Sequence, residues 1–320
     1  MGRIVYSKNM EFTPKNNIIT LAAHNGSFHT DDVFAIATWL LYLEKKVPGT
    51  PVQVMRTRHP AEIAEADVVV DVGGEYDSTR FRFDHHQRGG AGVRENTIPY
   101  ASFGLVWKHI GPYLCGNDAE LWEKIDTSLV CAIDAYDNGK DVAKMLVEGV
   151  NVPTLPLFMM IEKPTWQERG SETAMFEAFM RAVTKAKAFL DRYMIVQQAR
   201  IKALREIVAT YNESANPAIV VFPHDYERIN FVDILPSLPG IFFYIYPDNS
   251  GTWSAEAVST TTGTFEKRKP FPVAWAGLHD EELQKVSGVE DALFCHNGLF
   301  MVKAQTEAGA VNLAKIALMS

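Results

Sequence analysis

Short apolar runs that each end in a histidine or an aspartate constrain the fold of this chain more than any other feature of the sequence. Residues 17–23 (NIITLAA) lead into His24, and residues 66–70 (ADVVV) lead into Asp71. Apolar runs of about four to eight residues, bounded by polar or glycine-rich stretches, are typical of buried strands. We therefore expect two buried strands whose carboxyl ends carry His24 and Asp71.

Helical patterns separate these apolar runs. Residues 33–46 (VFAIATWLLYLEKK) repeat apolar side chains at helical spacing, residues 52–56 suggest a further strand, and residues 61–66 (AEIAEA) suggest a short helix. Alternating strands and helices are typical of an α/β domain built on a mostly parallel sheet. Such sheets bind ligands beyond the carboxyl ends of their strands, which is where the polar loops of this sequence lie.

The remainder of the chain predicts a connector and a second domain. Helical patterns cover residues 102–111 and 119–135, and residues 171–214 contain no glycine or proline and repeat apolar residues at helical spacing. Beyond them, strand-like runs such as IFFYIY and WSAEAV dominate. We expect an α/β domain over residues 1–170, a long helical connector over 171–214 and a smaller α+β domain over 215–320.

Charge and hydropathy restrict the class of protein. The 320 residues carry a net charge of −8, whereas proteins that coat duplex nucleic acid non-specifically are normally basic. No apolar run approaches the roughly 20 residues needed to cross a bilayer, and the opening MGRIVYSKNMEF lacks the pattern of a secretory signal. These features predict a cytoplasmic protein without a membrane span. No feature indicates an assembly state, and a homodimer is an open alternative.

Histidines and aspartates are concentrated in two loops. The residues concerned are His24, His29, Asp31 and Asp32 in the first loop, and Asp84, His85 and His86 in the second. Each has an ordinary explanation by itself, because aspartates commonly cap helices and occupy turns. Their conjunction at strand ends of one sheet predicts a metal site. Imidazole nitrogen with carboxylate oxygen suits manganese, iron, cobalt or zinc, and two ions could clamp the attacking and leaving oxygens of a phosphoryl transfer.

These motifs resemble those of the DHH phosphoesterase superfamily, which includes RecJ-type exonucleases, oligoribonucleases and family II pyrophosphatases. Its motifs are a histidine followed by an acid-x-acid pair, an aspartate that ends an apolar strand, an Asp-His-His triplet and an aspartate after a helix. The corresponding segments here are HNGSFHTDD, VVVDVGG, RFDHHQ and LVCAIDAYDNG. In the first segment, His29 stands where the superfamily usually has an acid. The resemblance implies a DHH-type amino-terminal domain that hydrolyses phosphoesters with the help of metal ions.

A closer resemblance is to the melanocyte-proliferating-gene family, described as metal-dependent protein hydrolases or exonucleases. It rests on the runs HNGSFHTDDVFA, VDVGGEYD, RFDHHQ, SFGLVWK, DAYDNG and KRKPFPVAW. It implies two divalent ions, manganese above all, with magnesium, cobalt, iron or zinc as alternatives. The implied ligands are His24, His29 and Asp71 for one ion, and Asp31, His85 and Asp134 for the other, with Asp71 as the bridge. Asp137 competes with Asp134 for the last position.

Further residues are candidates for catalysis and substrate binding. His86, beside a ligand, could hold a phosphoryl oxygen, move a proton or orient its neighbour. The predicted catalytic group consists of His86, the bridging Asp71, Arg82 and Arg88. Arginines near the triplet that could bind phosphates in a bidentate manner are Arg82, Arg88 and Arg94. Candidates for substrate binding in the second domain are the basic run Lys267, Arg268 and Lys269, otherwise a solvated surface, and His296, which the resemblance places at a substrate-contacting position.

The residues by themselves support hydrolysis of a phosphoester or phosphoanhydride. The resemblance narrows this expectation to a 3′–5′ exonuclease or oligonucleotide phosphodiesterase acting on single-stranded RNA. A small-molecule phosphatase such as a pyrophosphatase is one alternative. A metal-stabilised RNA-binding or regulatory protein without turnover is another, because His29 departs from the superfamily pattern.

Overall fold

A computed structural model describes residues 12, 17–143, 147–150, 152–168 and 171–320 of the chain. The chain forms two compact units, Met1–Gln198 and Ala199–Ser320. Except for Phe12, the amino-terminal stretch in which the sequence predicts no secretory signal lies outside the described residues.

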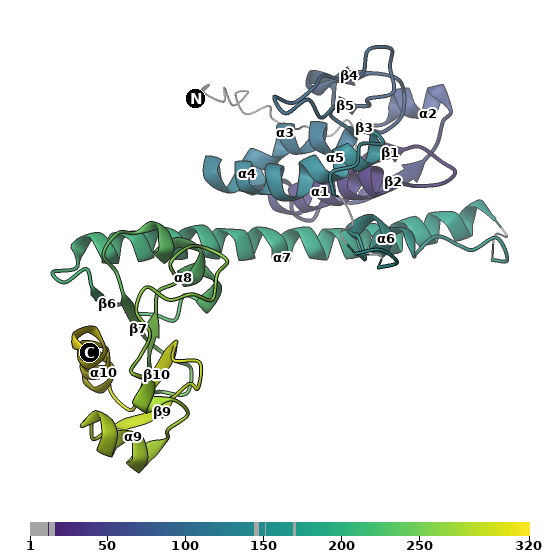
Figure 1. Ribbon diagram of the computed structural model, residues 1–320. Coiled ribbons are helices and arrows are strands. Elements are labelled where there is room, and N and C mark those ends of the chain that lie inside the picture. Colours follow the sequence, from purple (N-terminus) through teal and green to yellow (C-terminus); the bar gives the residue numbers. More distant parts are fainter. Residues whose placement is uncertain (1–11, 13–16, 144–146, 151, 169–170) are drawn as a thin grey trace. The chain divides into compact units, whose positions relative to one another are not determined.

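The first unit is built on a five-stranded, mostly parallel sheet (Figure 1). Its strands are β1 (Ile19–Ala23), β2 (Val52–Arg56), β3 (Val68–Val70), β4 (Tyr76–Asp77) and β5 (Arg82–Phe83). They are ordered β2-β1-β3-β5-β4, and only the pairing of β4 with β5 is antiparallel. The predicted α/β class with a mostly parallel sheet is confirmed.

The strand order reverses between β1 and β3. From β1 the chain passes through helix α1 (Thr30–Lys46) to β2 on one side, and then through α2 (Pro60–Glu65) to β3 on the other side of β1. In open parallel sheets the loops that leave such a reversal in opposite directions frame a ligand crevice. This crevice lies at the carboxyl ends of β1 and β3, where His24 and Asp71 follow.

Helices on one face of this sheet carry the remaining polar motifs. Helix α3 (Ser102–Leu114) packs against α1, and both contact the sheet. The predicted helix over residues 119–135 consists of α4 (Ala119–Ile125), a π-helical stretch (Asp126–Val130) and α5 (Cys131–Asp137). Large buried side chains between these layers are Phe34, Trp39, Phe83, Phe103 and Trp107.

Two more helices follow in the chain. Helix α6 (Leu155–Met160) is short, whereas the predicted connector is one continuous helix, α7 (Glu172–Glu213). Within the first unit, Phe179 of α7 contacts Phe28 with ring centroids 5.6 Å apart. Within the second unit, Ile207 of α7 belongs to a buried apolar cluster. The two units divide inside this helix, between Gln198 and Ala199.

The second unit has a five-stranded sheet of its own. Its strands, in the order β6-β7-β8-β10-β9, are β6 (Ile219–Val221), β7 (Phe243–Pro247), β8 (Trp253–Ala257), β10 (Met301–Ala304) and β9 (Ala292–Cys295). Only β6 and β7 pair in parallel. Its helices are α8 (Arg228–Ile234), α9 (Asp280–Ser287) and α10 (Glu307–Met319).

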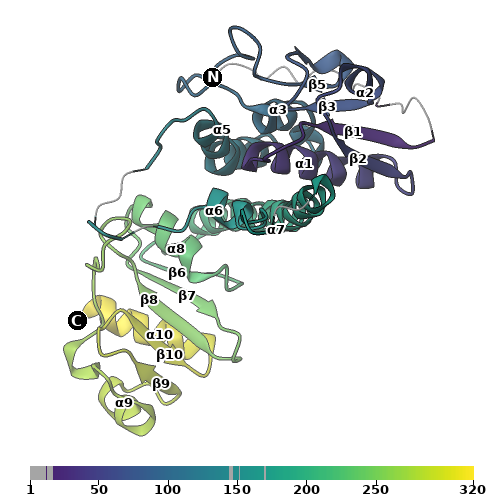
Figure 2. The ribbon, with the colours of Figure 1, turned by 90° about the vertical axis from the view of Figure 1, so that its right-hand side faces the viewer.

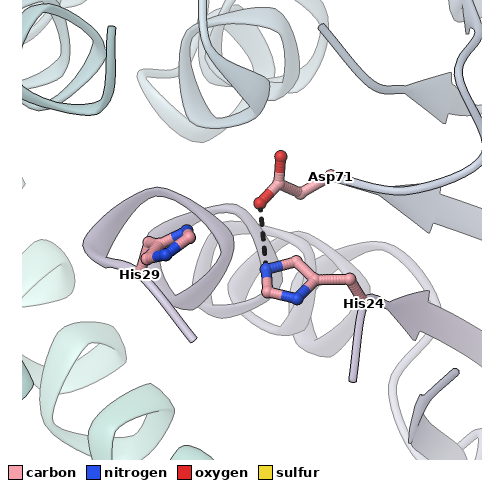
Figure 3. Close-up of side chains that lie close together, drawn as sticks. All are labelled: His24, His29 and Asp71. Carbon is pink, nitrogen blue, oxygen red and sulfur yellow. Dashed lines mark ion pairs between the residues drawn. The ribbon is translucent and has the colours of Figure 1, made fainter. Parts of the chain in front are cut away.

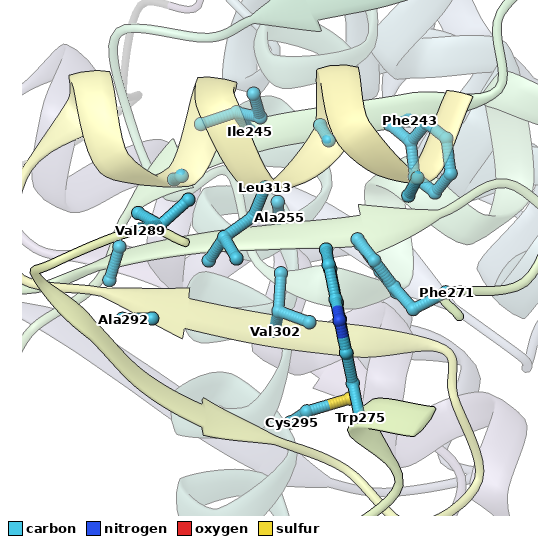
Figure 4. Packing of buried hydrophobic residues seen from close by; sticks show 14 of the residues in the cluster. Phe243, Ile245, Ala255, Phe271, Trp275, Val289, Ala292, Cys295, Val302 and Leu313 are labelled. Carbon is cyan, nitrogen blue, oxygen red and sulfur yellow. The ribbon is translucent and has the colours of Figure 1, made fainter. Parts of the chain in front are cut away.

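One of the buried apolar clusters of the second unit lies between its sheet and α10 (Figures 2 and 4). Leu313 of α10 lies in one buried cluster with Ile245, Ala255 and Val302, which come from three neighbouring strands. A mostly antiparallel sheet covered by helices agrees with the α+β fold expected for this part of the chain. In the described part of the chain, no helix combines the length and apolar character that crossing a membrane requires.

Candidate metal centre

The loop after β1 and the loop after β3 bring His24 and Asp71 together (Figure 3). His24 Nε2 lies 3.3 Å from Asp71 Oδ2 and 3.2 Å from Asp32 Oδ2. His29 precedes α1, and its ring centroid lies 5.6 Å from that of His24. One nitrogen or oxygen from each of His24, His29 and Asp71 lies within 4.8 Å of the others. These three residues therefore form one candidate group of metal ligands.

Asp71 has an unusual backbone conformation for a residue with a side chain. Its φ of 55° lies in the left-handed region, and Gly73 and Gly74 after it also have positive φ. Such conformations cost about 1 kcal/mol or more and persist where surrounding contacts enforce them, often at functional sites. The Ser102 hydroxyl donates a hydrogen bond to Asp71 Oδ1 over 3.2 Å and so helps to orient the carboxylate.

Asp84 organises the second histidine loop. Its carboxylate accepts hydrogen bonds from the backbone N–H groups of Gly74 and His85, over 2.5 and 2.7 Å, and lies 2.8 Å from His86 Nδ1. Although burial opposes ionisation, the hydrogen bonds from His86 and from backbone N–H groups outweigh it and lower the pKa of Asp84. The first residue of the triplet thus shapes the loop, and the two histidines after it face Asp71.

His85 joins Asp71 to a second candidate group. His85 Nε2 lies 3.3 Å from Asp71 Oδ1 and 3.3 Å from Asp137 Oδ2. Asp31, His85 and Asp137 offer ligand atoms within 4.8 Å of one another, as do Asp71, His85 and His86. Asp31 is fully buried in the first turn of α1. Burial, followed by the nearby charges of Asp71 and Asp137, raises its pKa well above the ordinary value.

Asp134 and Asp137 have different surroundings, which separates the two alternatives that the sequence leaves open. Asp134 is fully buried, accepts a hydrogen bond from Gly104 N over 3.0 Å and lies 2.9 Å from Arg94 Nη2. It is not part of any candidate ligand group among the described residues, whereas Asp137 is. The geometry thus favours Asp137, and the sequence-based preference for Asp134 disagrees with it because α5 turns Asp134 toward α3 and Arg94.

The electrostatics of the cluster fit a cation. Burial lowers the pKa of His24 and His85, but the carboxylates beside them outweigh it and raise their pKa values to about 10 and about 11. Although Asp71 is buried, His24 and His85 hold its pKa below the ordinary value. Asp71 Oδ2 and His85 Nε2 are also buried without a hydrogen-bond partner. One of these atoms is an oxygen of the Asp71 carboxylate, and the other is a histidine nitrogen beside its second oxygen. Divalent ions would satisfy both atoms.

Comparison with known proteins identifies the family of this chain. The family model described as "Uncharacterised protein family (UPF0160)", MYG1_exonuc, matches residues 20–318. The chain belongs to the MYG1 family. It is 31% identical over 329 residues to the human MYG1 exonuclease, covering 93% of this chain and 85% of that protein. It is 29% identical to a MYG1 protein of Schizosaccharomyces pombe, covering 95% and 98% of the two chains.

A solved structure of RecJ with Mn²⁺ from Thermus thermophilus overlaps only weakly with this MYG1-family chain. The TM-score is 0.27 at 12% sequence identity, with 94% of this chain and 52% of the RecJ chain covered. An overlap of this size has no bearing on the site.

Two of the arginines predicted near the triplet have structural partners in this MYG1-family chain. Arg82 donates to the backbone carbonyls of Ala66 and Asp67, over 3.0 and 3.2 Å, at the amino-terminal side of β3 and away from the cluster. Arg94 is nearly buried and pairs with Asp126 and Asp134. Arg88 is exposed, and its side chain has no recorded partner among the described residues. The expected catalytic role of Arg82 thus disagrees with its position, because carbonyl groups occupy its guanidinium.

Some of the substrate-binding candidates of the second unit are engaged by other protein groups, and others are not. Arg268 donates to the carbonyls of Pro236, Leu238 and Ile241 over 2.6, 2.7 and 2.9 Å, which holds a loop and leaves little for a substrate. Lys267 Nζ donates to Ser259 Oγ over 2.9 Å and lies 5.9 Å from the ring of Phe300. The remaining two candidates are Lys269, which is partly exposed, and His296, whose ring lies 4.2 Å from that of Phe300.

A pocket of about 910 Å³ adjoins the His24 side of the cluster. Its wall includes His24, His29 and His86, together with Arg56 and Arg58 from the end of β2. Neither arginine belongs to the sequence motifs that predict the site. The signal that could have found them is their position at the carboxyl end of a third parallel strand, next to the strand that leads into His24.

Proposed function

We propose that this chain is a divalent-metal-dependent phosphodiesterase of the DHH type that removes nucleotides from single-stranded RNA in the 3′–5′ direction. The relatives named MYG1 exonuclease support nuclease activity. RNA as the substrate, the direction of cleavage and manganese as the metal rest on the resemblance of the sequence motifs to that superfamily.

The position of Asp71 between two histidines carries this proposal. Its Oδ2 lies 3.3 Å from His24 Nε2 and its Oδ1 lies 3.3 Å from His85 Nε2. Asp71 belongs to two candidate ligand groups, one with His24 and His29 and one with His85 and His86, so it would contact both ions of a pair. We assign His24, His29 and Asp71 to one ion and Asp31, His85 and Asp137 to the other. Two divalent ions bound there would lower the pKa of an attacking water and neutralise charge on the phosphoryl oxygens.

His86 is placed to assist from the protein side. Its side chain is 60% exposed, while its Nδ1 lies 2.8 Å from Asp84 Oδ1 and 3.4 Å from Asp71 Oδ1. The hydrogen bond with Asp84 raises the pKa of His86, against the opposing effect of burial. A histidine whose pKa is raised in this way can donate a hydrogen bond to a phosphoryl oxygen or a proton to the leaving oxygen.

The test is hydrolysis of an end-labelled single-stranded RNA in manganese, in magnesium and in chelator, beside the DNA counterpart, a dinucleotide and pyrophosphate. We expect stepwise shortening from the 3′ end in manganese and none in chelator. Asp71→Asn should reduce the rate by about three orders of magnitude, because it weakens the charge that holds both ions. Asp191→Asn, which changes a half-exposed carboxylate on α7, is the matched control and should cleave like the wild type.

Other outcomes would change the assignment. Cleavage of pyrophosphate alone would make the protein a small-molecule phosphatase. Two bound ions per chain without turnover of any substrate in the panel would make it a metal-stabilised binding protein.

A further inference from the structure

Two arginines at the carboxyl end of β2 stand beside the candidate metal centre. Arg56 ends β2 and pairs in register with Ala23, the last residue of β1. The backbone N–H of Thr57 donates to Ala23 O over 2.8 Å, so the chain beyond β2 stays next to the loop that carries His24. Arg56 and Arg58 both line the pocket that His24 and His29 also line.

The guanidinium of Arg56 is held in place but not satisfied. It lies 4.7 Å from the ring centroid of Phe179 and 5.6 Å from that of Phe28, and its Nη1 donates to Gly26 O over 3.0 Å. Its Nε and Nη2 are buried without a hydrogen-bond partner. Nε and Nη2 lie on one edge of the planar guanidinium and form the two-pronged donor that matches two oxygens of a phosphate. Leaving such donors buried and unpaired is costly, which indicates a missing acceptor.

The charge of Asp32 acts on Arg56, but it does so without a close ion pair. Within the described residues, no ion pair involves Arg56 or Arg58, and Arg58 is exposed. By contrast, Arg82 near the triplet is engaged by backbone carbonyls. Arg94 pairs with Asp126 and Asp134 through Nη2, although its Nε and Nη1 are also buried without a hydrogen-bond partner. Unpaired cations at a pocket wall raise the local concentration of anions there.

The rest of the pocket wall suits one class of anion. Met175 and Phe176 of α7 add apolar surface to the wall, and Glu172 adds an acidic side chain. A nucleic acid strand combines phosphate groups with flat apolar faces, so it can use the arginines and the aromatic surface together. Free phosphate would use only the arginines.

We propose that Arg56 and Arg58 bind the phosphodiester group next to the scissile one in a single-stranded oligonucleotide. Arg56 contributes a bidentate contact fixed by Phe179, and Arg58 contributes charge at the pocket mouth. This assignment rests on the proposed function for the identity of the scissile bond, but binding by the arginines is independent of turnover.

The experiment compares wild type, Arg56→Lys, Arg58→Gln and the control Arg192→Gln, which removes an exposed arginine of α7 outside the pocket. Two substrates are hydrolysed in manganese: a single-stranded RNA of about ten nucleotides and bis(p-nitrophenyl) phosphate, which has no neighbouring phosphate. We expect each pocket variant to raise KM for the RNA by about tenfold, the effect of losing a charged hydrogen bond. Their kcat/KM for the small diester and all constants of the control should stay near wild type.

A binding measurement separates the subsite from the reaction. Fluorescence anisotropy of the same RNA in chelator, at several salt concentrations, should give a salt slope smaller by about 0.7 for Arg58→Gln, which removes a charge. Arg56→Lys keeps the charge and loses the bidentate contact, so it should weaken RNA binding with little change in the salt slope. RNA binding that depends on both arginines, without hydrolysis by the wild type, would keep the subsite and overturn the proposed function. An equal loss on the small diester, unchanged RNA kinetics in both variants, or no RNA binding by the wild type would each overturn the subsite.

Discussion

Within helix α5, Asp134 and Asp137 lie three residues apart and have different surroundings. Asp134 accepts a hydrogen bond from Gly104 N and faces the nearly buried Arg94, while Asp137 lies beside His85. Burial, followed by the opposing charge of Arg94, leaves the pKa of Asp134 raised to about 8. The Asp134 side chain therefore contributes to packing and to the charge balance of Arg94. Asp137, about one turn further along the same helix, is free to bind a cation.

Substitution separates these two tasks. Asp137→Asn should weaken Mn²⁺ binding by more than the roughly 100-fold that loss of an outer-shell partner costs, with little change in thermal stability. Asp134→Asn should lower the free energy of unfolding by about 3 kcal/mol at about pH 9, above the pKa of Asp134, where the substitution leaves Arg94 buried with one carboxylate fewer. Isothermal titration with Mn²⁺ and thermal unfolding of both variants check this, and the reverse pattern would restore Asp134 as the ligand.

His109 provides a pH-dependent contribution to stability that is separate from the metal centre. It lies among aromatic rings, 5.3 Å from Phe83 and 5.8 Å from Phe81 between centroids, and burial lowers its pKa from 6.5 to about 4. The unfolded chain therefore binds a proton in this range that the folded chain does not. Stability should fall as the pH drops from 6.5 toward 4, by about 2 kcal/mol at pH 5.

His109→Phe removes this titration and keeps an aromatic ring. Urea unfolding of wild type and variant at about pH 7 and about pH 5 should show a loss on acidification that is smaller by about 2 kcal/mol in the variant. An equal loss in both proteins would mean that His109 is protonated in the fold.

At the scale of elements, the contact between helices α3 and α5 determines the position of Asp137, the ligand that α5 carries. A methyl group on Gly104 would lie 1.9 Å from Asp134 Oδ2, far inside van der Waals contact. The glycine therefore allows α5 to approach α3 closely enough for the backbone of Gly104 to hold Asp134. This close approach also sets the rotation of α5 that brings Asp137 to His85.

We expect Gly104→Ala to change the free energy of unfolding in the opposite direction to most glycine-to-alanine substitutions in helices. Replacing glycine by alanine inside a helix normally stabilises it by about 1 kcal/mol, but here overpacking should destabilise the protein by about 2 kcal/mol or more. The double variant Gly104→Ala/Asp134→Ala removes the clash and should be more stable than the sum of the single changes predicts. Strict additivity in denaturant unfolding would contradict the proposed contact.

At the scale of the whole molecule, the ligands and the second core belong to different compact units. All residues assigned to the two ions lie in the first unit, whereas the second unit has its own sheet and apolar clusters. A ligand stabilises only the structure that binds it, by about 2.7 kcal/mol at 100 times its dissociation constant.

Hydrogen exchange of the full chain with and without Mn²⁺ tests this division. Protection should rise in β1, β3 and α1, which surround the cluster, and should stay unchanged in β7, β8 and α10. Magnesium-free, manganese-free buffer with chelator is the reference. Equal protection of both units on adding Mn²⁺ would show that they unfold as one.

Local patterns in the sequence are enough to predict several parts of this protein. Apolar runs end where β1 and β3 end, so His24 and Asp71 could be placed at one edge of a parallel sheet, and the long helix α7 follows from an uninterrupted helical pattern. The choice between Asp134 and Asp137 needed the folded chain, because the rotation of α5 is set by its contact with Gly104 and Arg94. The same holds for Arg56, whose neighbours Gly26 and Phe179 are remote in the sequence and meet it only through sheet pairing and helix packing.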